Sequence, residues 1–390
     1  MSSRSASAIR KMFEEGIALK AQYGADHVFD FSLGNPDLEP PEEVFQAVAR
    51  IAADRTHGCH GYMPNAGYPE VREAMAAKET LEQGVQVTGS SVIMSCGAAG
   101  AMNCVFKAVL NPGDEVLVPV PFFSEYRHYV GNHGGILREV QSKPDFSLDT
   151  NAIARSLTER TAAVIINSPN NPSGRIYSAA DIASLAEVLH EHGRKTGRYP
   201  YLICDEPYRA ITFGGKKVAP VFSVYEHAVV VTSFAKNLSL PGERIGYICV
   251  NPACPDHDEL VAACIFATRV LGYVNAPAFF QKVAASSWNA PCDYSPYEKR
   301  CHEMTAVLDN AGISYAEPEG AFYLFCKVPD GWNDDDGAFV DHLKRHLILC
   351  APGSGFGCKG WFRIAYCVSE DTIVNSKAAF YTAAHTKQGE

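Results

Sequence analysis

The run YLICDEPY at residues 201–208 is the clearest indication of how this chain folds. Its first four residues are apolar, and Asp205 follows them. Apolar runs at 163–167 and 229–232 are likewise followed by polar residues. Strands that are apolar along nearly their whole length are typical of parallel sheets with both faces covered. The run therefore predicts a buried strand over 201–205 in such a sheet.

Outward from this run, short β-rich segments alternate with helical patterns, which predicts an α/β fold. The predicted strands are 92–95, 115–119, 136–140, 163–167, 201–205, 229–232 and 247–250. The predicted helices between them are 100–110, 126–131, 179–192 and 260–271. We expect a three-layer αβα large domain with a mostly parallel seven-stranded sheet.

The pattern changes near residue 297, where a smaller α+β domain is predicted. Helices at 297–310 and 337–346 alternate there with strand-like runs at 321–327 and 361–366. The predicted boundaries are 1–41 for an N-terminal helix and arm that packs with the small domain, 42–285 for the large domain, and 286–390 for the small domain. Within the first segment, Ile9, Met12, Phe13 and Ile17 follow a helical spacing, which predicts an amphipathic helix.

Composition narrows the class of function. The 390 residues hold 34 Lys+Arg against 44 Asp+Glu, a formal charge of −10, with no basic run, so we expect no nucleic-acid partner. The 13 cysteines are odd in number and lack a C-x-x-C pair, which favours free thiols in a reducing compartment. The longest uncharged stretch, 84–106, is too polar to span a bilayer. We therefore expect a cytoplasmic protein with no membrane partner that acts on small molecules.

A short histidine and cysteine motif deserves mention because of its spacing. His57, Cys59 and His60 have the spacing of metal ligands, but no second cluster in the sequence completes a four-ligand site. We therefore predict no metal site.

Small or polar groups follow four of the predicted strands. They lie at 97–100, 167–172, 205–208 and 233–236. In open α/β sheets, ligands bind beyond the carboxyl ends of the strands. These four groups should therefore meet at one edge of the sheet and form the site.

Taken singly, each group has a simpler interpretation. Lys236 could be a solvated lysine, Asp205 could cap the next helix, and the turn at 170–174 could be only a turn. The residues 97–100 could serve close packing, or an anion site at a helix start. Together they offer an amine, a carboxylate, hydrogen-bond donors and an anion cradle. Pyridoxal 5'-phosphate is the cofactor that uses all four.

Four motifs carry a resemblance to a known family. N-S-P-N-N-P-S-G at 167–174, D-E-P-Y at 205–208, S-F-A-K at 233–236 and F-R-I-A-Y at 362–366 occur in this order. Over about 31–367 the chain resembles the class I aminotransferases among the fold-type I pyridoxal-phosphate enzymes, the aspartate aminotransferase-like superfamily. The resemblance implies a transferase with this cofactor.

The resemblance implies roles at the cofactor ring. Lys236 is similar to the Schiff-base lysine that also carries the proton, and Asp205 to the partner of the ring nitrogen. Tyr208 and Asn171 are similar to the donors to the ring hydroxyl oxygen. Phe123 stands where the family stacks an aromatic side chain on the ring, although a core phenylalanine fits that position equally well.

The resemblance also implies a phosphate cradle formed by Gly97, Ala98, Ala99, Ser233 and Arg244. Many relatives have Ser or Thr in the small-residue turn where this chain has alanines. Because the backbone donors survive that change, we expect phosphate binding with one hydroxyl contact fewer.

Further residues are implied for the substrate and for a second subunit. Arg363 is similar to the arginine that binds the substrate α-carboxylate, with Gly34 and Asn171 beside it; an internal salt bridge is its main alternative. Tyr62 is similar to a tyrosine that reaches the phosphate of the neighbouring subunit, which implies a homodimer with shared active sites.

The function implied is an aminotransferase that moves an amino group between an L-amino acid and a 2-oxo acid by a ping-pong mechanism. One alternative is a lyase of the carbon–sulfur type, or a γ-synthase or decarboxylase, on the same scaffold. Arg363 disfavours decarboxylation because it would hold the carboxylate. A second alternative is a non-catalytic protein that binds an effector. The sequence assigns no second arginine to a distal carboxylate and does not identify the substrate.

Overall fold

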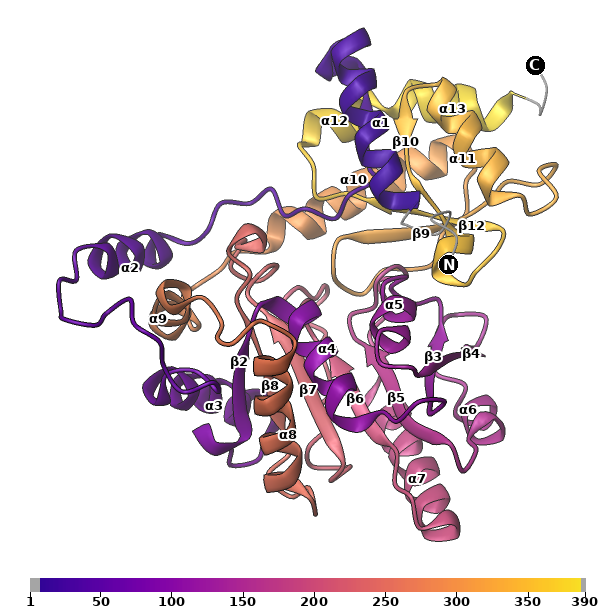
Figure 1. The fold of residues 1–390 in the computed structure, drawn as a ribbon. Coiled ribbons are helices and arrows are strands. Elements are labelled where there is room, and N and C mark those ends of the chain that lie inside the picture. The colour runs from indigo at the N-terminus through magenta and orange to yellow at the C-terminus, as the bar shows by residue number, and fades with distance from the viewer. Residues whose placement is uncertain (1–7, 387–390) are drawn as a thin grey trace.

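A seven-stranded sheet forms the centre of the computed structural model, which describes residues 8–386 (Figure 1). The strand order is β2-β8-β7-β6-β5-β3-β4, and only β8 runs antiparallel to its neighbours. The mostly parallel sheet predicted from the sequence is confirmed. Its strands are β2 (Val92–Ser95), β3 (Glu115–Val120), β4 (Ile136–Gln141), β5 (Thr161–Asn167), β6 (Tyr201–Asp205), β7 (Ala228–Ser233) and β8 (Gly246–Val250).

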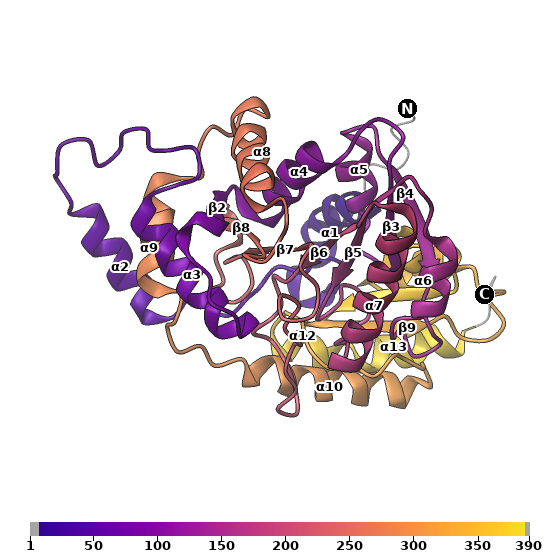
Figure 2. The same cartoon turned by 90° about the horizontal axis from the view of Figure 1, so that it is seen from below.

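Helices cover both faces of this sheet, as Figure 2 shows along the strands. Along β6, Ile203 packs toward one helical layer, while Leu202 and Cys204 pack toward the other. One layer holds α4 (Gly97–Val109), α5 (Tyr126–Gly131) and α8 (His257–Val270). The other holds α2 (Glu42–Ala52), α3 (Pro69–Gln83), α6 (Thr150–Ser156), α7 (Ala179–Thr196) and α9 (Ala278–Ser287). The predicted three-layer arrangement is confirmed.

Local signals explain the limits of some of these helices. The side chain of Ser178 accepts a hydrogen bond from the backbone N–H of Asp181, and the carboxylate of Asp181 accepts one from the backbone N–H of Ser178, so a capping box starts α7. Gly197 ends the same helix in the left-handed conformation, at φ 76°.

The set of predicted helices was incomplete. Helix α4 begins at Gly97 rather than at residue 100, and α3 was not predicted. The buried face of α3 includes Lys78, Glu79 and Gln83, which hide the apolar periodicity of a helix. Lys78 and Glu79 are buried because they bind each other and Tyr247, and Oε1 of Gln83 accepts a hydrogen bond from the backbone N–H of Val221. No local pattern reveals these contacts.

A second hydrophobic cluster lies around a small antiparallel sheet with the order β11-β12-β9. Its strands are β9 (Tyr323–Lys327), β11 (Ala351–Pro352) and β12 (Trp361–Ala365), and β1 (Phe29–Asp30) pairs in parallel with β10 (Ile348–Leu349). The helices around it are α1 (Ala8–Tyr23), α10 (Ser295–Ala311), α11 (Asp336–Arg345), α12 (Glu370–Asn375) and α13 (Lys377–His385). Short 3₁₀ turns occur at Ala25–His27, Gly89–Ser91, Pro241–Glu243 and Gly353–Phe356.

The N-terminal part of the chain connects the two clusters. Met12 of α1 is buried in the second cluster, and residues 31–41 then cross to α2 beside the large sheet (Figure 1). Ile17, expected on the buried face of α1, is instead 58% exposed. The residue limits of the domains stay a prediction.

Two properties of the described chain bear on its chemistry. All of its 13 cysteines are free thiols within residues 8–386. In the same range, no helix combines the length and apolar character that crossing a bilayer requires.

Candidate active site

A cavity of about 310 Å³ lies where the strand ends of the large sheet meet the small sheet. The strand-end residues Asn167, Asp205 and Ser233 line one side, and Tyr323 of β9 and Arg363 of β12 line the other. The carboxyl edge of the sheet is thus closed by the second cluster, which turns an open crevice into a pocket.

Most of the residues predicted for the site line this one cavity. They are Gly34, Ala98, Ala99, Phe123, Asn171, Asp205, Tyr208, Ser233, Lys236, Arg244 and Arg363.

Two predicted residues do not line the cavity. Gly97 lies behind its wall, where an added Cβ would be 2.8 Å from Nη2 of Arg244. Tyr62 is 92% exposed and belongs to a separate surface hollow with His60 and Tyr273. In a single chain Tyr62 therefore contributes nothing to the cavity.

Lys236 follows β7 after a short turn and extends into the cavity. Its Nζ donates a hydrogen bond of 2.7 Å to the carbonyl oxygen of Gly34. Burial lowers the pKa of the Lys236 ammonium to about 8; Cys367 opposes this shift, and the positive charges of Arg363 and Arg244 contribute to it. Near neutral pH a useful fraction of this amine is therefore unprotonated, as a nucleophile or base requires.

Asp205 ends β6 and has one bound and one unbound oxygen. The Tyr126 hydroxyl donates to its Oδ2 at 2.5 Å, whereas its buried Oδ1 has no hydrogen-bond partner in the described chain. Burial raises the pKa of Asp205 to about 6, although the Tyr126 hydrogen bond opposes this. A buried carboxylate oxygen without a donor is unfavourable, so Asp205 is ready to receive an N–H group from a ligand.

Asn167 holds the ends of two strands together. Its Nδ2 donates to the carbonyl oxygen of Asp205 at 2.8 Å, and its Oδ1 accepts from the backbone N–H of Asn171 at 2.7 Å. Asn167 thereby fixes the position of the turn that carries Asn171 relative to β6.

Two tyrosines close the cavity from opposite sides. The hydroxyl groups of Tyr208 and Tyr323 are 2.8 Å apart in a hydrogen bond. Tyr208 follows β6 and Tyr323 begins β9, so this bond joins the large sheet to the small one. Nζ of Lys236 lies 5.8 Å from the centre of the Tyr208 ring.

Arg363 is a buried cation without a carboxylate partner. It is 2% exposed, and its guanidinium donates to Oδ1 of Asn171 at 3.1 Å and to the carbonyl oxygen of Ser32 at 2.6 Å. Its Nε has no partner, and no carboxylate of residues 8–386 forms an ion pair with it. The internal salt bridge that was the alternative interpretation is therefore not formed.

A second guanidinium and a helix terminus lie at the other end of the cavity. Ala98 and Ala99 belong to the first turn of α4, where backbone N–H groups have no partner within the helix. Arg244 lines the same region, and it too lacks an ion pair with any described carboxylate. The free N–H groups and the guanidinium make this region suitable for an anion such as a phosphate.

The charges around the cavity are unbalanced. Lys236, Arg244 and Arg363 face a single carboxylate, Asp205. Two unpaired guanidinium groups at separate places in one pocket favour a ligand set with two anionic groups.

Sequence reasoning assigned no role to several of these residues. The cavity is also lined by Tyr126, Asn167, Tyr129 and Tyr323, which were not predicted individually as site residues. For Asn167 the signal was present, because it starts the motif at 167–174. Tyr323 carries no such signal, since it reaches Tyr208 across 115 residues of sequence.

Comparison with known proteins identifies the family. Residues 26–376 match the model of "Aminotransferase class I and II". A probable aspartate/prephenate aminotransferase of Aquifex aeolicus is 33% identical, over 89% of this chain and 88% of the relative. The aspartate/prephenate aminotransferase of Thermus thermophilus is 30% identical, over 87% of this chain and 86% of its own.

Solved structures agree with this result. An aminotransferase from Eubacterium rectale superposes with a TM-score of 0.93 at 37% identity, covering 97% of this chain and 95% of the other. A single mutant of Thermus thermophilus aspartate aminotransferase gives a TM-score of 0.87 at 28% identity, covering 98% and 99%. The chain therefore belongs to the class I and II aminotransferase family and is a transferase of the transaminase type.

Proposed function

We propose that this aminotransferase uses pyridoxal 5'-phosphate to move an amino group between an L-amino acid and a 2-oxo acid by a ping-pong mechanism. The observation that carries the proposal is the shared cavity of Lys236, Asp205 and Arg363. Lys236 supplies an amine with a lowered pKa, and Asp205 supplies a carboxylate with one oxygen that lacks a donor. Arg363 supplies a guanidinium that lacks an anionic partner.

The residues present fit the cofactor at both of its ends. Oδ1 of Asp205 needs a donor, which a protonated pyridine nitrogen would provide. The first turn of α4, Ser233 and Arg244 offer donors and positive charge to a phosphate. When bound, pyridoxal phosphate supplies an electron sink for the substrate's Cα. Phe123 lines the same cavity and is proposed to stack on the ring.

Lys236 is proposed to act as nucleophile and base. The lowered pKa of its ammonium keeps part of the amine neutral near pH 7. In that form Nζ can remove the proton from Cα of the amino acid, and in the reverse half-reaction return it to Cα of the product. In the chain without cofactor, the hydrogen bond of Nζ to the carbonyl oxygen of Gly34 holds the amine in the cavity.

Arg363 is proposed to bind the substrate α-carboxylate. Asn171 and Ser32 hold its guanidinium, so little rotational freedom is lost when an anion binds. A planar guanidinium binds both oxygens of a carboxylate and thereby orients Cα, with a backbone donor from Gly34 and the side chain of Asn171 alongside. Fixing the carboxylate in this way favours loss of the Cα proton over loss of carbon dioxide.

Tyr208 and Asn171 are proposed to donate hydrogen bonds to the ring hydroxyl oxygen of the cofactor. Both side chains are buried and line the cavity with Asp205. Burial and the neighbouring Tyr323 hydroxyl raise the pKa of Tyr208, which keeps its phenol protonated and able to donate.

A homodimer is proposed to complete each site. Tyr62 is 92% exposed and lies outside the cavity of its own chain, so it can contact a phosphate only across a subunit interface.

We also propose a cytoplasmic location, since free buried thiols such as Cys204 and Cys249 persist in a reducing compartment. The domain limits 42–285 and 286–390 remain part of this proposal.

The substrate side chain has no further cation to meet in this cavity. Its charged lining residues within the described chain are Lys236, Asp205, Arg244 and Arg363, and each already has a proposed role. Because Tyr129, Met102 and Leu33 line the remaining surface, we propose that uncharged amino acids are accepted. Aspartate is included in the test because relatives are named for it.

A half-reaction tests the proposal. The purified enzyme is mixed with one amino acid at a time, without any oxo acid, and the cofactor spectrum and products are followed. Transamination predicts one equivalent of 2-oxo acid per subunit, conversion of the cofactor to its amine form, and restoration on adding a 2-oxo acid. Continuous release of ammonia or a thiol would instead show a lyase. Protein that neither holds pyridoxal phosphate nor converts any amino acid would refute the proposal and favour an effector-binding protein.

A further inference from the structure

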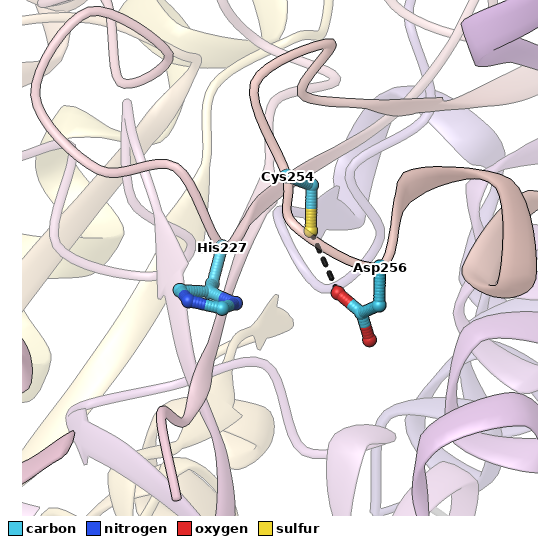
Figure 3. A group of neighbouring side chains, drawn as sticks. All are labelled: His227, Cys254 and Asp256. Atoms are coloured by element: carbon cyan, nitrogen blue, oxygen red, sulfur yellow. Dashed lines mark hydrogen bonds between the residues drawn. The ribbon is translucent and has the colours of Figure 1, made fainter. Parts of the chain in front are cut away.

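His227, Cys254 and Asp256 gather at the edge of the large sheet opposite to the active site. His227 directly precedes β7, and Cys254 and Asp256 lie in the connection from β8 to α8. Because β8 is antiparallel to β7, its end returns to the start of β7, with Val250 paired to Val229. One ligand atom from each of the three side chains lies within 4.8 Å of the others (Figure 3).

The carboxylate and thiol in this cluster are already held in position. Sγ of Cys254 donates a hydrogen bond of 3.1 Å to Oδ1 of Asp256. The hydroxyl of Tyr201 donates to Oδ2 of the same carboxylate. Oδ2 of Asp256 is thus bound by Tyr201, and Oδ1 is bound by the sulfur of Cys254.

The imidazole of His227 is positioned by aromatic neighbours. Its ring stacks on that of Tyr199, with centroids 5.0 Å apart and planes 14° apart, and it meets Tyr201 edge-on at 6.2 Å. Figure 3 shows the ring directed toward the space beside Cys254 and Asp256. The carboxylate of Glu226 lies 3.9 Å from Nε2 of His227 and adds negative charge behind the ring. The same carboxylate is hydrogen-bonded to His190 at 2.7 Å.

We propose that His227, Cys254 and Asp256 form a binding site for a divalent transition-metal ion of the zinc class. A sulfur, a nitrogen and an oxygen ligand together are typical of zinc sites and unusual for magnesium or calcium. On binding, the thiol of Cys254 releases its proton to solvent, so the thiolate and the carboxylate of Asp256 balance the two charges of the ion. The fourth position remains for water.

The required movement is small. Zinc–ligand distances of about 2.0–2.3 Å place tetrahedral ligand atoms about 3.5 Å apart. The present spacing needs side-chain shifts of about 1 Å to reach that value. His227 and Asp256 are half-buried, which leaves access for an ion, while Cys254 is 5% exposed.

The cluster was not predicted, since the sequence-based expectation was a protein without a metal. The motif that had drawn attention, His57, Cys59 and His60, does not converge on a common point among the described side chains. It therefore provides an internal control that has histidine and cysteine side chains but no common centre.

The effect of an ion here would be structural. It would join the segment before β7 to the connection before α8, at the edge of the sheet away from Lys236. We therefore expect metal binding to raise thermal stability without changing the rate of transamination.

Cobalt titration tests the site. The holoenzyme is freed of adventitious metal with a chelator, dialysed, and titrated with Co²⁺. We expect one equivalent per chain, with a thiolate-to-cobalt charge-transfer band that Zn²⁺ displaces, and a Tm that Zn²⁺ raises by a few degrees. Cys254→Ser should lose the band and weaken binding at least about tenfold, whereas Cys59→Ser should behave as the parent.

A second variant guards against loss of the fold. Asp256→Asn keeps the thiol and should weaken Co²⁺ binding while circular dichroism and transaminase activity stay as in the parent. Absence of any charge-transfer band in the parent, a band that survives Cys254→Ser, or one that disappears with Cys59→Ser would each overturn the proposal.

Discussion

The phenol of Tyr126 donates a hydrogen bond of 2.5 Å to Oδ2 of Asp205, and Oδ1 of the same carboxylate has no donor in the described chain. Tyr126 of helix α5 thus binds one carboxylate oxygen of Asp205, and the other oxygen is available to a ligand in the cavity. This division keeps the carboxylate oriented, and burial raises its pKa to about 6. A protonated ring nitrogen is the group that would complete it.

The first prediction concerns the pH dependence of stability in the cofactor-free protein. The folded-state pKa of Asp205, about 6, lies above its ordinary value of 3.8, so the folded chain binds more protons than the unfolded one between these values. Stability from this group is therefore present at low pH and is lost as pH rises through about 6. Relative to Asp205→Asn, the parent should lose on the order of 2–3 kcal/mol between pH 4 and 7.

Urea unfolding of both cofactor-free proteins across that range measures this difference. Equal pH dependence in the two would contradict the raised pKa. Adding pyridoxal phosphate should reduce the difference, because an N–H donor then meets Oδ1.

Lys236→Ala should abolish the visible absorbance of the lysine-bound cofactor and lower the turnover rate by about 100- to 10,000-fold. The substitution removes the amine that we propose as nucleophile and base, and positioned bases contribute on this order. The absorption spectrum and the half-reaction rate provide the measurement. Lys216→Ala, which changes a lysine paired with Glu319 outside the cavity, is the control. An unchanged spectrum in Lys236→Ala would contradict the assignment.

Arg363→Lys should raise KM for amino acids about 10- to 100-fold and leave cofactor retention nearly unchanged. A lysine lacks the planar pair of donors, and a hydrogen bond to a charged group contributes about 1.5–3 kcal/mol. The control ligand is the decarboxylated analogue of the substrate, an amine with the same side chain but no carboxylate, and its binding is measured in parallel. That amine should bind parent and variant alike; if its affinity falls as much as that of the amino acid, Arg363 does not bind the carboxylate.

Tyr62→Phe should lower the affinity for pyridoxal phosphate about tenfold if its hydroxyl reaches the partner's phosphate. Tyr381→Phe, another exposed tyrosine, is the control. Hybrid dimers of Tyr62→Phe chains with Lys236→Ala chains should contain one site with both native residues and so regain normal cofactor affinity and turnover. A hybrid whose one competent site keeps the weakened cofactor affinity of Tyr62→Phe, or a monomeric protein in solution, would exclude shared sites.

Gly97→Ala should impair phosphate binding, whereas Gly84→Ala should not. Both glycines have left-handed backbones, with φ of 71° and 67°, so both changes should cost about 1–2 kcal/mol of unfolding free energy. Only the methyl group at 97 would approach Nη2 of Arg244, at 2.8 Å, and move it. Urea unfolding and cofactor titration of the two variants separate these effects. Equal cofactor affinity in both would show that Arg244 tolerates the methyl group.

Much of the fold could be predicted because the strands are locally recognisable. The runs that became β5, β6 and β7 are apolar on both faces and end in polar residues, so their order and common edge follow from the pattern. Helix α3 could not be predicted in this way. Its buried Lys78 and Glu79 are stable there because Tyr247, about 170 residues further on, binds both.

The same division holds for the site. Asp205 ends β6 and Lys236 follows β7 after a short turn, so the order of the strands brings both to one edge of the sheet. The bond from Tyr126 to Asp205, the pair of Tyr208 with Tyr323, and the absence of a carboxylate beside Arg363 in the described chain depend on contacts across many residues. Local patterns of polarity record whether a residue is buried, but the partner that a buried polar atom meets is set by how distant segments pack in three dimensions.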